Sequence, residues 1–307
     1  MISRPPVAVT GATGFVGQAL VEEAQARGVL LRALVRREQP ARPGVEWVGG
    51  DLADRAALAD LVAGSQAVLH IAGVVNTPDP EGFHLGNVAG TEALVEAARA
   101  VGVRRLVFVS SLAAREPGLS AYGKSKRLAE EAVETSGLEW TIVRPPAIYG
   151  PRDRELLDLF KAARWGVVPI PPPGRASIIH VGDLARLLLD LVLSGAGETN
   201  ERIFEPDDGR EGGWSHRELA LAIGEAVGRA VWAPALPKSV LAAGATLDGW
   251  LRGVKAKLTT DRVGYMSHPD WVSRADKAPP EGLWGPRIPT PEGLAATAHW
   301  YREHGWL

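Results

Sequence analysis

Residues 9–20 read VTGATGFVGQAL and place Gly11, Gly14 and Gly17 between an apolar run and a helix-like run. A turn alone needs one glycine, so three at this spacing indicate that the backbone must approach another group closely. Gly11 follows the apolar run directly and permits a tight turn, Gly14 lets a pyrophosphate approach, and Gly17 lets the helix pack close to the sheet. Free N–H groups at the helix start then face the anion. The stretch therefore predicts a strand, a phosphate-binding turn and a helix.

The composition is that of a globular protein and limits the possible functions. Of the 307 residues, 46% are hydrophobic and 23% are charged, and the formal net charge is −2 without a long block of one sign. This balance gives no support for a nucleic-acid surface or an anionic-membrane surface. There are no cysteines, which excludes disulfides and thiolate chemistry. Neither a signal peptide nor a membrane span of roughly 20 apolar residues is recognisable, and we expect a cytoplasmic protein.

Short apolar runs alternate with helical patterns in the first half of the chain. We expect strands at 7–12, 30–37, 45–52, 67–73, 104–111 and 139–150. We expect helices at 14–27, from 53 to about 64, at 87–102 and at 122–136. Strands that alternate with helices imply right-handed crossovers, so the predicted fold class is α/β with a doubly wound, mostly parallel sheet.

After about Pro151 the alternation weakens, and prolines and tryptophans become frequent. Residues 176–195 still read as a strand and a helix. We therefore expect a first domain over 1–165, to which 176–200 returns, and a smaller C-terminal α+β domain formed by 166–175 and 201–307.

The C-terminal part also contains helical patterns of its own. We expect helices at 216–230 and 238–254, irregular chain from about 267 to 291, and a terminal helix. The helix at 238–254 is amphipathic, so it is compatible with a membrane surface. Its polar face is not strongly basic, which favours packing on its own domain.

The glycine spacing and four later segments carry a family resemblance. The form TGxxGxxG, rather than GxGxxG, resembles the extended short-chain dehydrogenase/reductase superfamily, the NAD-dependent epimerase/dehydratase family. The same resemblance extends to HIAG (70–73), NVAGTEALVEAA (from 87), RPPAIYGP (144–151) and IHVGDLA (179–185). Their order over about residues 5–195 implies a Rossmann fold, a bound nicotinamide dinucleotide and a substrate pocket between the domains.

The resemblance also implies cofactor contacts. Those that we expect are Gly11, Thr13, Gly14, Phe15, Val16, Gly17, Asp51, Leu52, Ala72, Gly73, Lys126 and Pro145. Asp51 would contact the adenine amino group. The alternative is that Asp51 belongs to a helix N-terminus, where Asp54 is the better capping candidate.

The end of the second strand bears on the choice of nucleotide. NAD sites usually carry an acidic residue there, which binds the ribose 2′-hydroxyl. This chain instead reads ALVRRE, with Val35 or Arg36 at the expected place and Arg37 after it. Because a guanidinium matches a 2′-phosphate, NADP(H) is favoured over NAD(H). The alternative is that the two arginines form a solvated strand end.

Tyr122 and Lys126 stand four residues apart in a helical run, so their side chains share one face. A phenol titrates near 10 and needs a neighbouring ammonium to work at neutral pH. The resemblance implies that Tyr122 is the general acid/base and that Lys126 tunes it and binds the nicotinamide ribose. A serine at the end of the preceding strand would orient the substrate oxygen. Ser111 is favoured, with Ser110 as the fallback; the other serine is expected to bond to backbone.

Candidate walls of the substrate pocket are Phe83, His84, Ser110, Tyr149 and Trp165, although ordinary packing explains each aromatic side chain equally well. His70 and His180 are interpreted as hydrogen-bonded strand-end histidines and Asn87 as a supporting residue. The seven histidines are scattered, and no metal site is expected.

In the family that the chain resembles, sugar-nucleotide enzymes typically have a VYG-type loop after the serine and a long insertion before the tyrosine. The loop SSLAAREPGLSAY is short and lacks VYG, so the resemblance favours simple hydride transfer over sugar-nucleotide chemistry. We therefore expect a carbonyl reductase or alcohol dehydrogenase that acts on an apolar ketone or alcohol. The alternatives are a sugar-nucleotide epimerase or dehydratase and a non-catalytic nucleotide-binding relative. The resemblance also implies a possible homodimer formed through the helices at 87–102 and 122–136.

Overall fold

A computed structural model describes residues 5–77, 79–253, 256 and 258–307 of the chain. The chain divides into two compact units. The first unit comprises the chain up to Arg144 together with Leu184–Phe204, and the second unit comprises Pro145–Asp183 and Glu205–Leu307. Position 254, at the end of one predicted helix, and the first four residues of the predicted first domain lie outside the described residues.

A seven-stranded parallel sheet forms the centre of the first unit, in the order β10-β6-β5-β4-β1-β2-β3. Its strands are β1 (Val7–Thr10), β2 (Leu31–Val35), β3 (Val45–Gly49), β4 (Ala67–His70), β5 (Arg105–Val109), β6 (Glu139–Val143) and β10 (Arg202–Phe204). The doubly wound parallel sheet predicted from the sequence is confirmed. The strand order reverses between β1 and β4, where sheets of this kind bind ligands beyond the carboxyl ends of their strands.

The strand predicted over 139–150 is in fact two strands, β6 and β7 (Ala147–Tyr149), and β7 pairs with β9 in a separate sheet. Arg144, Pro145 and Pro146 separate them. A proline has no N–H to donate to a ladder, so two in succession end the pairing.

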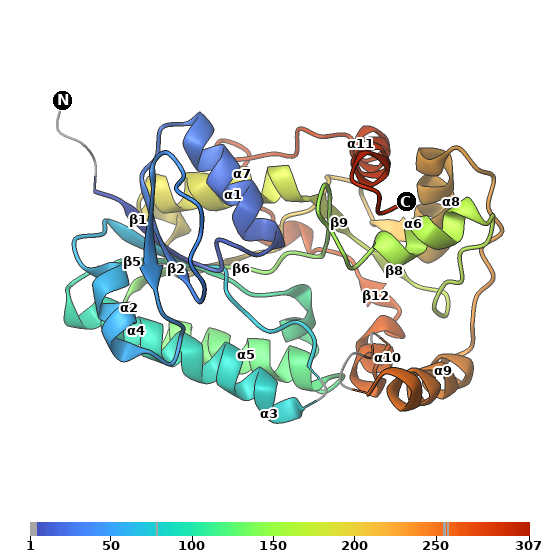
Figure 1. The fold of residues 1–307 in the computed structure, drawn as a ribbon, viewed down its shortest axis with the longest axis horizontal. Helices are drawn as coiled ribbons and strands as arrows, with labels where there is room; N and C mark the ends of the chain where they lie inside the picture. The colour runs from blue at the N-terminus through green and yellow to red at the C-terminus, as the bar shows by residue number, and fades with distance from the viewer. Residues whose placement is uncertain (1–4, 78, 254–255, 257) are drawn as a thin grey trace. The chain divides into compact units, whose positions relative to one another are not determined.

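Helices cover both faces of the sheet in the first unit (Figure 1). One face carries α2 (Arg55–Val62), α4 (Gly90–Ala100) and α5 (Ala121–Glu134), and the other carries α1 (Phe15–Ala26) and the part of α7 (Val181–Leu193) from Leu184 onward. The predicted helix at 87–102 begins earlier, since α3 (Pro80–Phe83) and a π-helical stretch η1 (His84–Ala89) lead directly into α4. Asp54 caps α2 by accepting the N–H groups of Ala56 and Ala57, which confirms its predicted capping role.

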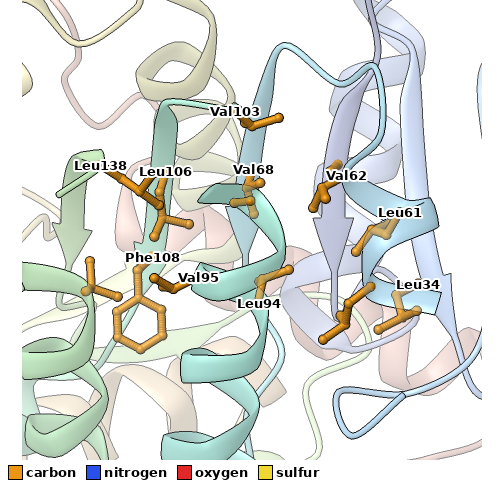
Figure 2. Packing of buried hydrophobic residues seen from close by; sticks show 14 of the residues in the cluster. Leu34, Leu61, Val62, Val68, Leu94, Val95, Val103, Leu106, Phe108 and Leu138 are labelled. Atoms are coloured by element: carbon orange, nitrogen blue, oxygen red, sulfur yellow. The ribbon is translucent and has the colours of Figure 1, made fainter. Parts of the chain in front are cut away.

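The core between the sheet and the helices α2, α4 and α5 consists mainly of aliphatic side chains, together with Phe108 and Trp140 (Figure 2). Leu61 and Val62 of α2 and Leu94 and Val95 of α4 pack over Val68, Leu106 and Phe108 of the sheet. Burying a side chain of this size stabilises the fold by about 1.5–3 kcal/mol, so this face fixes both helices to the sheet.

The second unit contains α6 (Leu157–Arg164), α8 (His216–Val227), α9 (Lys238–Arg252), α10 (Thr260–Met266) and α11 (Thr290–Glu303). Its strands are β7, β8 (Arg175–Ala176), β9 (Ile178–His180), β11 (Trp214–Ser215) and β12 (Asp270–Trp271). Its core joins α6, α8 and α11 around Phe160, Ile223 and Tyr301. The segment predicted as irregular at 267–291 includes β12 and the 3-10 turn η5 (Ala275–Lys277), which were too short to be recognised from periodicity.

Candidate active site

The glycine turn lies at the carboxyl edge of the first unit's sheet, where β1 and β4 are neighbours. Gly11 has φ +80°, in the region that favours glycine, and a Cβ there would lie 2.6 Å from the amide nitrogen of Ala72. The turn after β1 and the segment after β4 are therefore in direct backbone contact. This contact brings Ala72 and Gly73 beside the turn.

The start of α1 has the features of an anion-binding cradle. Gly14 is its N-cap and makes no side-chain capping bond, and the first turn carries no acidic residue. Thr13 and Gly14 are exposed, while Phe15 and Val16 are half-buried. A Cβ on Gly17 would lie 2.0 Å from the carbonyl oxygen of Gly11, so only glycine lets α1 fold back over the turn. These residues fit a dinucleotide phosphate.

The residues expected around the adenosine follow β2 and β3. Arg36 and Arg37 come directly after β2 and are exposed, so both guanidinium groups are accessible to an anion. Asp51 is also exposed, and its Oδ1 accepts the N–H of Ala53 at 2.9 Å. Leu52 is half-buried against the core and contacts the start of α4 at Gly90.

The two serines after β5 have different surroundings. Ser110 is buried, and its hydroxyl donates to Oε1 of Glu130 at 2.5 Å. Ser111 is half-buried, caps the short helix η2 (Leu112–Arg115) and accepts the N–H of Ala113 at 3.2 Å. The expectation that the second serine bonds to backbone is wrong for Ser110, because a buried carboxylate is the stronger acceptor. This bond leaves Ser111 as the accessible hydroxyl.

Tyr122 lies in the first turn of α5, whose N-cap Ser120 accepts the N–H of Gly123 at 2.9 Å. A Cβ on Gly123 would lie 2.6 Å from the carbonyl oxygen of Ala113, so α5 starts in backbone contact with η2. This contact brings the helix of Tyr122 against the turn that Ser111 begins. Gly123, which was not expected from the sequence to have a role, is therefore needed for the close approach of α5 to η2.

Lys126 points inward from α5 and is buried. Its ammonium Nζ donates to the carbonyl oxygen of Val109 at 2.8 Å and lies 4.6 Å from the centre of the Phe108 ring. A Cβ on Gly73 would lie 3.5 Å from that Nζ, which places Lys126 beside the segment after β4. Burial lowers the pKa of Lys126 from 10.5 to about 8, against the opposing charge of Glu130.

Asn87 holds the segment after β4 in place. Its side-chain oxygen accepts the N–H of Val74 at 2.7 Å, and its amide donates to the carbonyl of Val74 and to the hydroxyl of Ser125. Ser125 precedes Lys126 in α5, so Asn87 ties this segment to the lysine's helix. The predicted supporting role of Asn87 agrees with these bonds.

His70, at the end of β4, is buried between two threonine hydroxyls. Thr91 donates its hydroxyl proton to the carbonyl of Asn87, so it accepts the N–H at Nε2 of His70 at 2.9 Å. The hydroxyl of Thr10 accepts the N–H of Ala72 and donates to Nδ1 at 2.6 Å. Burial, and then the charge of Lys126, lower the pKa of His70 to about 3. His70 is therefore a neutral structural histidine, in agreement with the interpretation from the sequence.

The predicted pocket residues of the first unit divide into one buried and one exposed side chain. Phe83 is 3% exposed, and its ring centre lies 5.9 Å from that of Tyr122. His84 is exposed at the start of η1. Phe83 therefore forms an apolar wall beside the tyrosine.

The remaining predicted residues belong to the second unit. Pro145 is buried at its start. Tyr149 is fully buried and stacks edge-on against His180, so its side chain has no surface for a substrate to touch in this structure. Trp165 follows α6 and is 87% exposed. His180 accepts the N–H of Gly182, and Asp183 accepts N–H groups of Arg287 and Ile288, which are structural roles.

A buried ion pair holds the side chain of Ser110, and it was not expected from the sequence. Glu130 is fully buried and accepts Nε and Nη2 of Arg144 at 2.8 and 2.6 Å, in addition to the Ser110 hydroxyl. Arg127 joins this cluster, with its Nη1 at 3.1 Å from Oε2 of Glu130. The helical period offered a signal, because Glu130 lies one turn after Lys126 on the buried face of α5.

Within the described residues, no group of three or more His, Cys, Asp or Glu side chains is placed to hold a metal ion. None of the described helices is both long and apolar enough to cross a bilayer.

The strand order and the glycine turn define a nicotinamide-dinucleotide-binding protein of the Rossmann type. A sequence profile described as NAD(P)H-binding matches residues 11–191, which is more than half of the chain. The chain therefore belongs to the NAD(P)H-binding family. It is a member of the extended short-chain dehydrogenase/reductase superfamily.

Among curated relatives, a ceramide reductase of Caulobacter vibrioides is 39% identical, over 99% of this chain and 97% of the relative. A 2-alkyl-3-oxoalkanoate reductase of Stenotrophomonas maltophilia is 35% identical over 52% of this chain and 56% of the relative. A ketoreductase of Stigmatella aurantiaca that acts on a farnesylated dihydroquinoline oxide is 30% identical over 62% and 65%.

Among solved structures, the protein gox2253 has a TM-score of 0.79 and 26% identity, covering 99% of this chain and all of that one. MoeE5, solved with UDP-glucuronic acid and NAD, has a TM-score of 0.72 and 23% identity, covering 97% of this chain and 99% of that one. This likeness supports the assignment of the fold alone. The chain is an NAD(P)-dependent enzyme, and its function is that of an oxidoreductase that interconverts a ketone and an alcohol.

Proposed function

We propose that this enzyme uses NADPH to reduce the ketone of a long-chain lipid of the ceramide type. The observation that carries the chemistry is the position of the Lys126 ammonium, buried on the face of α5 beside Gly73 and close to the glycine turn. The substrate class is supported by the ceramide reductase, which resembles this chain over almost its whole length. The two ketoreductase relatives also act on carbonyl compounds that carry alkyl or farnesyl groups.

The proposed catalytic residues are Tyr122, Lys126 and Ser111. When bound, the nicotinamide supplies the hydride to the carbonyl carbon. Tyr122 donates its phenolic proton to the carbonyl oxygen, and Ser111 donates a hydrogen bond that orients this oxygen. Lys126 stabilises the resulting phenolate through its positive charge. Phe83 provides an apolar wall beside the phenol.

The test is to mix the purified protein with NADPH and an N-acylated long-chain 3-ketone, dispersed in detergent, and to follow absorbance and product. Consumption of NADPH with formation of the alcohol supports the proposal. Conversion of a UDP- or dTDP-sugar without net consumption of cofactor would assign the alternative activity of an epimerase or dehydratase. Cofactor binding without turnover of any substrate would identify a non-catalytic relative.

The buried ammonium predicts a pH dependence. We expect kcat/KM for ketone reduction to be constant below pH about 8 and to fall above it, because Lys126 then loses the charge that supports Tyr122. A profile measured from pH 6 to 10 checks this. An activity that stays level up to pH 10 would remove Lys126 from the mechanism.

Stability gives a second readout of the same group. The unfolded chain keeps the lysine proton up to about pH 10.5, whereas the folded chain releases it near 8. The unfolded state therefore binds more protons between these values, and this group makes the free energy of unfolding rise with pH there. Lys126→Met should lack this contribution.

We infer that NADP(H) is preferred to NAD(H) because Arg36 is exposed directly after β2. Arg36→Ala is expected to weaken NADPH binding by about 10- to 100-fold, the value of a charge-assisted hydrogen bond, and to leave NADH binding nearly unchanged. Dissociation constants for both cofactors check this. Arg42→Ala, a change at another arginine in the connection between β2 and β3, serves as the control. An equal loss for both cofactors would exclude a contact with the 2′-phosphate.

We also propose that the enzyme works in the cytoplasm as a homodimer. The family resemblance supports pairing through α4 and α5, and light scattering of the pure protein measures the mass in solution. A dissociable nicotinamide cofactor must be regenerated in the compartment where the enzyme works, which fits the cytoplasm. Cell fractionation tests this location.

A further inference from the structure

Helix α9 presents an unusual surface. Four of its large apolar side chains are at least half exposed: Val240 (50%), Leu247 (55%), Trp250 (81%) and Leu251 (65%). With Ala243 they occupy positions i, i+3, i+7, i+10 and i+11, which lie on one side of a helix. Tryptophan is seldom left this exposed, because most of its surface is apolar.

The opposite side of α9 is the one that packs within the second unit. The helix contacts α10, Gly244 faces Leu258, and Ala245 is its only buried residue among those described. Asp248 on this side accepts the N–H of Leu258 at 2.9 Å. The helix therefore packs on its own domain, as expected, but small residues fill the contact with α10 and the large apolar side chains remain outside it.

In the second unit, α9 and α10 lie apart from the cluster formed by α6, α8 and α11 (Figure 1). None of the core residues of that cluster comes from α9 or α10. The exposed stripe of α9 is thus not an unfilled part of the unit's main core.

The charge around this stripe points to its occupant. Residues 237–258 contain four basic side chains (Lys238, Arg252, Lys255 and Lys257) and one acidic side chain (Asp248), a net charge of 4 − 1 = +3. The whole chain carries −2, so the remainder carries −2 − 3 = −5. Along the sequence, positive charge is therefore concentrated in α9 and directly after it, which the overall balance conceals. Within the helix, Arg252 pairs with Asp248 at 3.2 Å. Amphipathic helices that carry Trp and Leu on one face and flanking Lys and Arg typically bind to the surface of an anionic bilayer.

We propose that α9 is a membrane-docking helix, which lies in the headgroup region of an anionic phospholipid bilayer with Trp250 and Leu251 inserted among the acyl chains. Lys238 and Arg252, the first and last residues of α9, contact lipid phosphates. The binding itself does not depend on the reaction; its use, to collect a lipid ketone from the bilayer, rests on the proposed function.

The experiment is flotation of the full-length protein with vesicles of phosphatidylcholine alone, or with one third of phosphatidylglycerol. We expect the protein to bind the anionic vesicles, and its affinity for them to fall as salt is added. In the double variant Trp250→Ser/Leu251→Ser, this affinity should fall by about tenfold or more. Trp232→Ser is the matched control, because Trp232 is a tryptophan of the same unit that is 66% exposed and lies outside α9. Circular dichroism shows that the variants fold.

Several outcomes would overturn the proposal. One is no binding to anionic vesicles, and another is an equal loss in the Trp250→Ser/Leu251→Ser variant and in Trp232→Ser. A third is a dimer in light scattering that this variant converts to monomer while vesicles remain unbound, which would identify a second copy as the occupant. Because flotation needs no turnover, vesicle binding without reduction of a lipid ketone refutes the proposed function and leaves the docking helix intact.

Discussion

Replacing Tyr122 with phenylalanine is expected to lower kcat for ketone reduction by about 100- to 10,000-fold, the usual contribution of a positioned general acid. The phenol is the one group among the three proposed catalytic residues that both gives up and regains the proton. Phenylalanine keeps the ring that packs near Phe83, so the start of α5 should keep its structure. Cofactor affinity should stay within about twofold, because its proposed contacts involve other side chains.

Tyr265→Phe is the control for this variant, because it removes a phenol from α10, a helix of the second unit that supplies none of the proposed catalytic residues. Steady-state kinetics with NADPH and fluorescence titration of the cofactor give the two readouts. Full activity of Tyr122→Phe would refute the catalytic assignment. A joint loss of activity and cofactor binding would show that the tyrosine acts structurally.

The second large effect is expected on stability. Glu130→Ala should lower the free energy of unfolding by about 3–5 kcal/mol, because it leaves the guanidinium of Arg144 buried without its carboxylate. The Ser110 hydroxyl loses its acceptor at the same time. For a unit of this size, such a loss lowers Tm by about 6–20 °C.

The neighbouring Glu131→Ala is the matched control. Glu131 belongs to the same helix, but its side chain is 50% exposed and its ion pair with Arg127 is at the surface. Such a pair contributes about 0–1 kcal/mol, so this variant should unfold nearly as the parent does. A double variant, Glu130→Leu/Arg144→Met, should recover most of the lost stability, because neither partner of the ion pair is then buried without the other. Equal destabilisation by the two single alanine variants would show that the buried pair has no special weight.

The sequence was sufficient to predict the chain's class. Alternating strand and helix patterns predict the doubly wound sheet, and the spacing of Gly11, Gly14 and Gly17 predicts the cofactor turn, because both signals are local along the chain. The relative positions of Tyr122 and Lys126 also follow from helical periodicity. The short strands and turns of the second unit could not be predicted, since elements such as β8 and β12 span only two residues each.

The tertiary structure decided the questions that depend on neighbours far away in the sequence. Ser110 and Ser111 are adjacent and chemically identical, and only the burial of Glu130 from α5 beside Ser110 distinguishes them. The exposure of Trp250 was likewise invisible in the sequence, because an apolar stripe looks the same whether it is covered or free. Periodicity tells which side chains share a face, whereas burial depends on what the rest of the chain brings against that face.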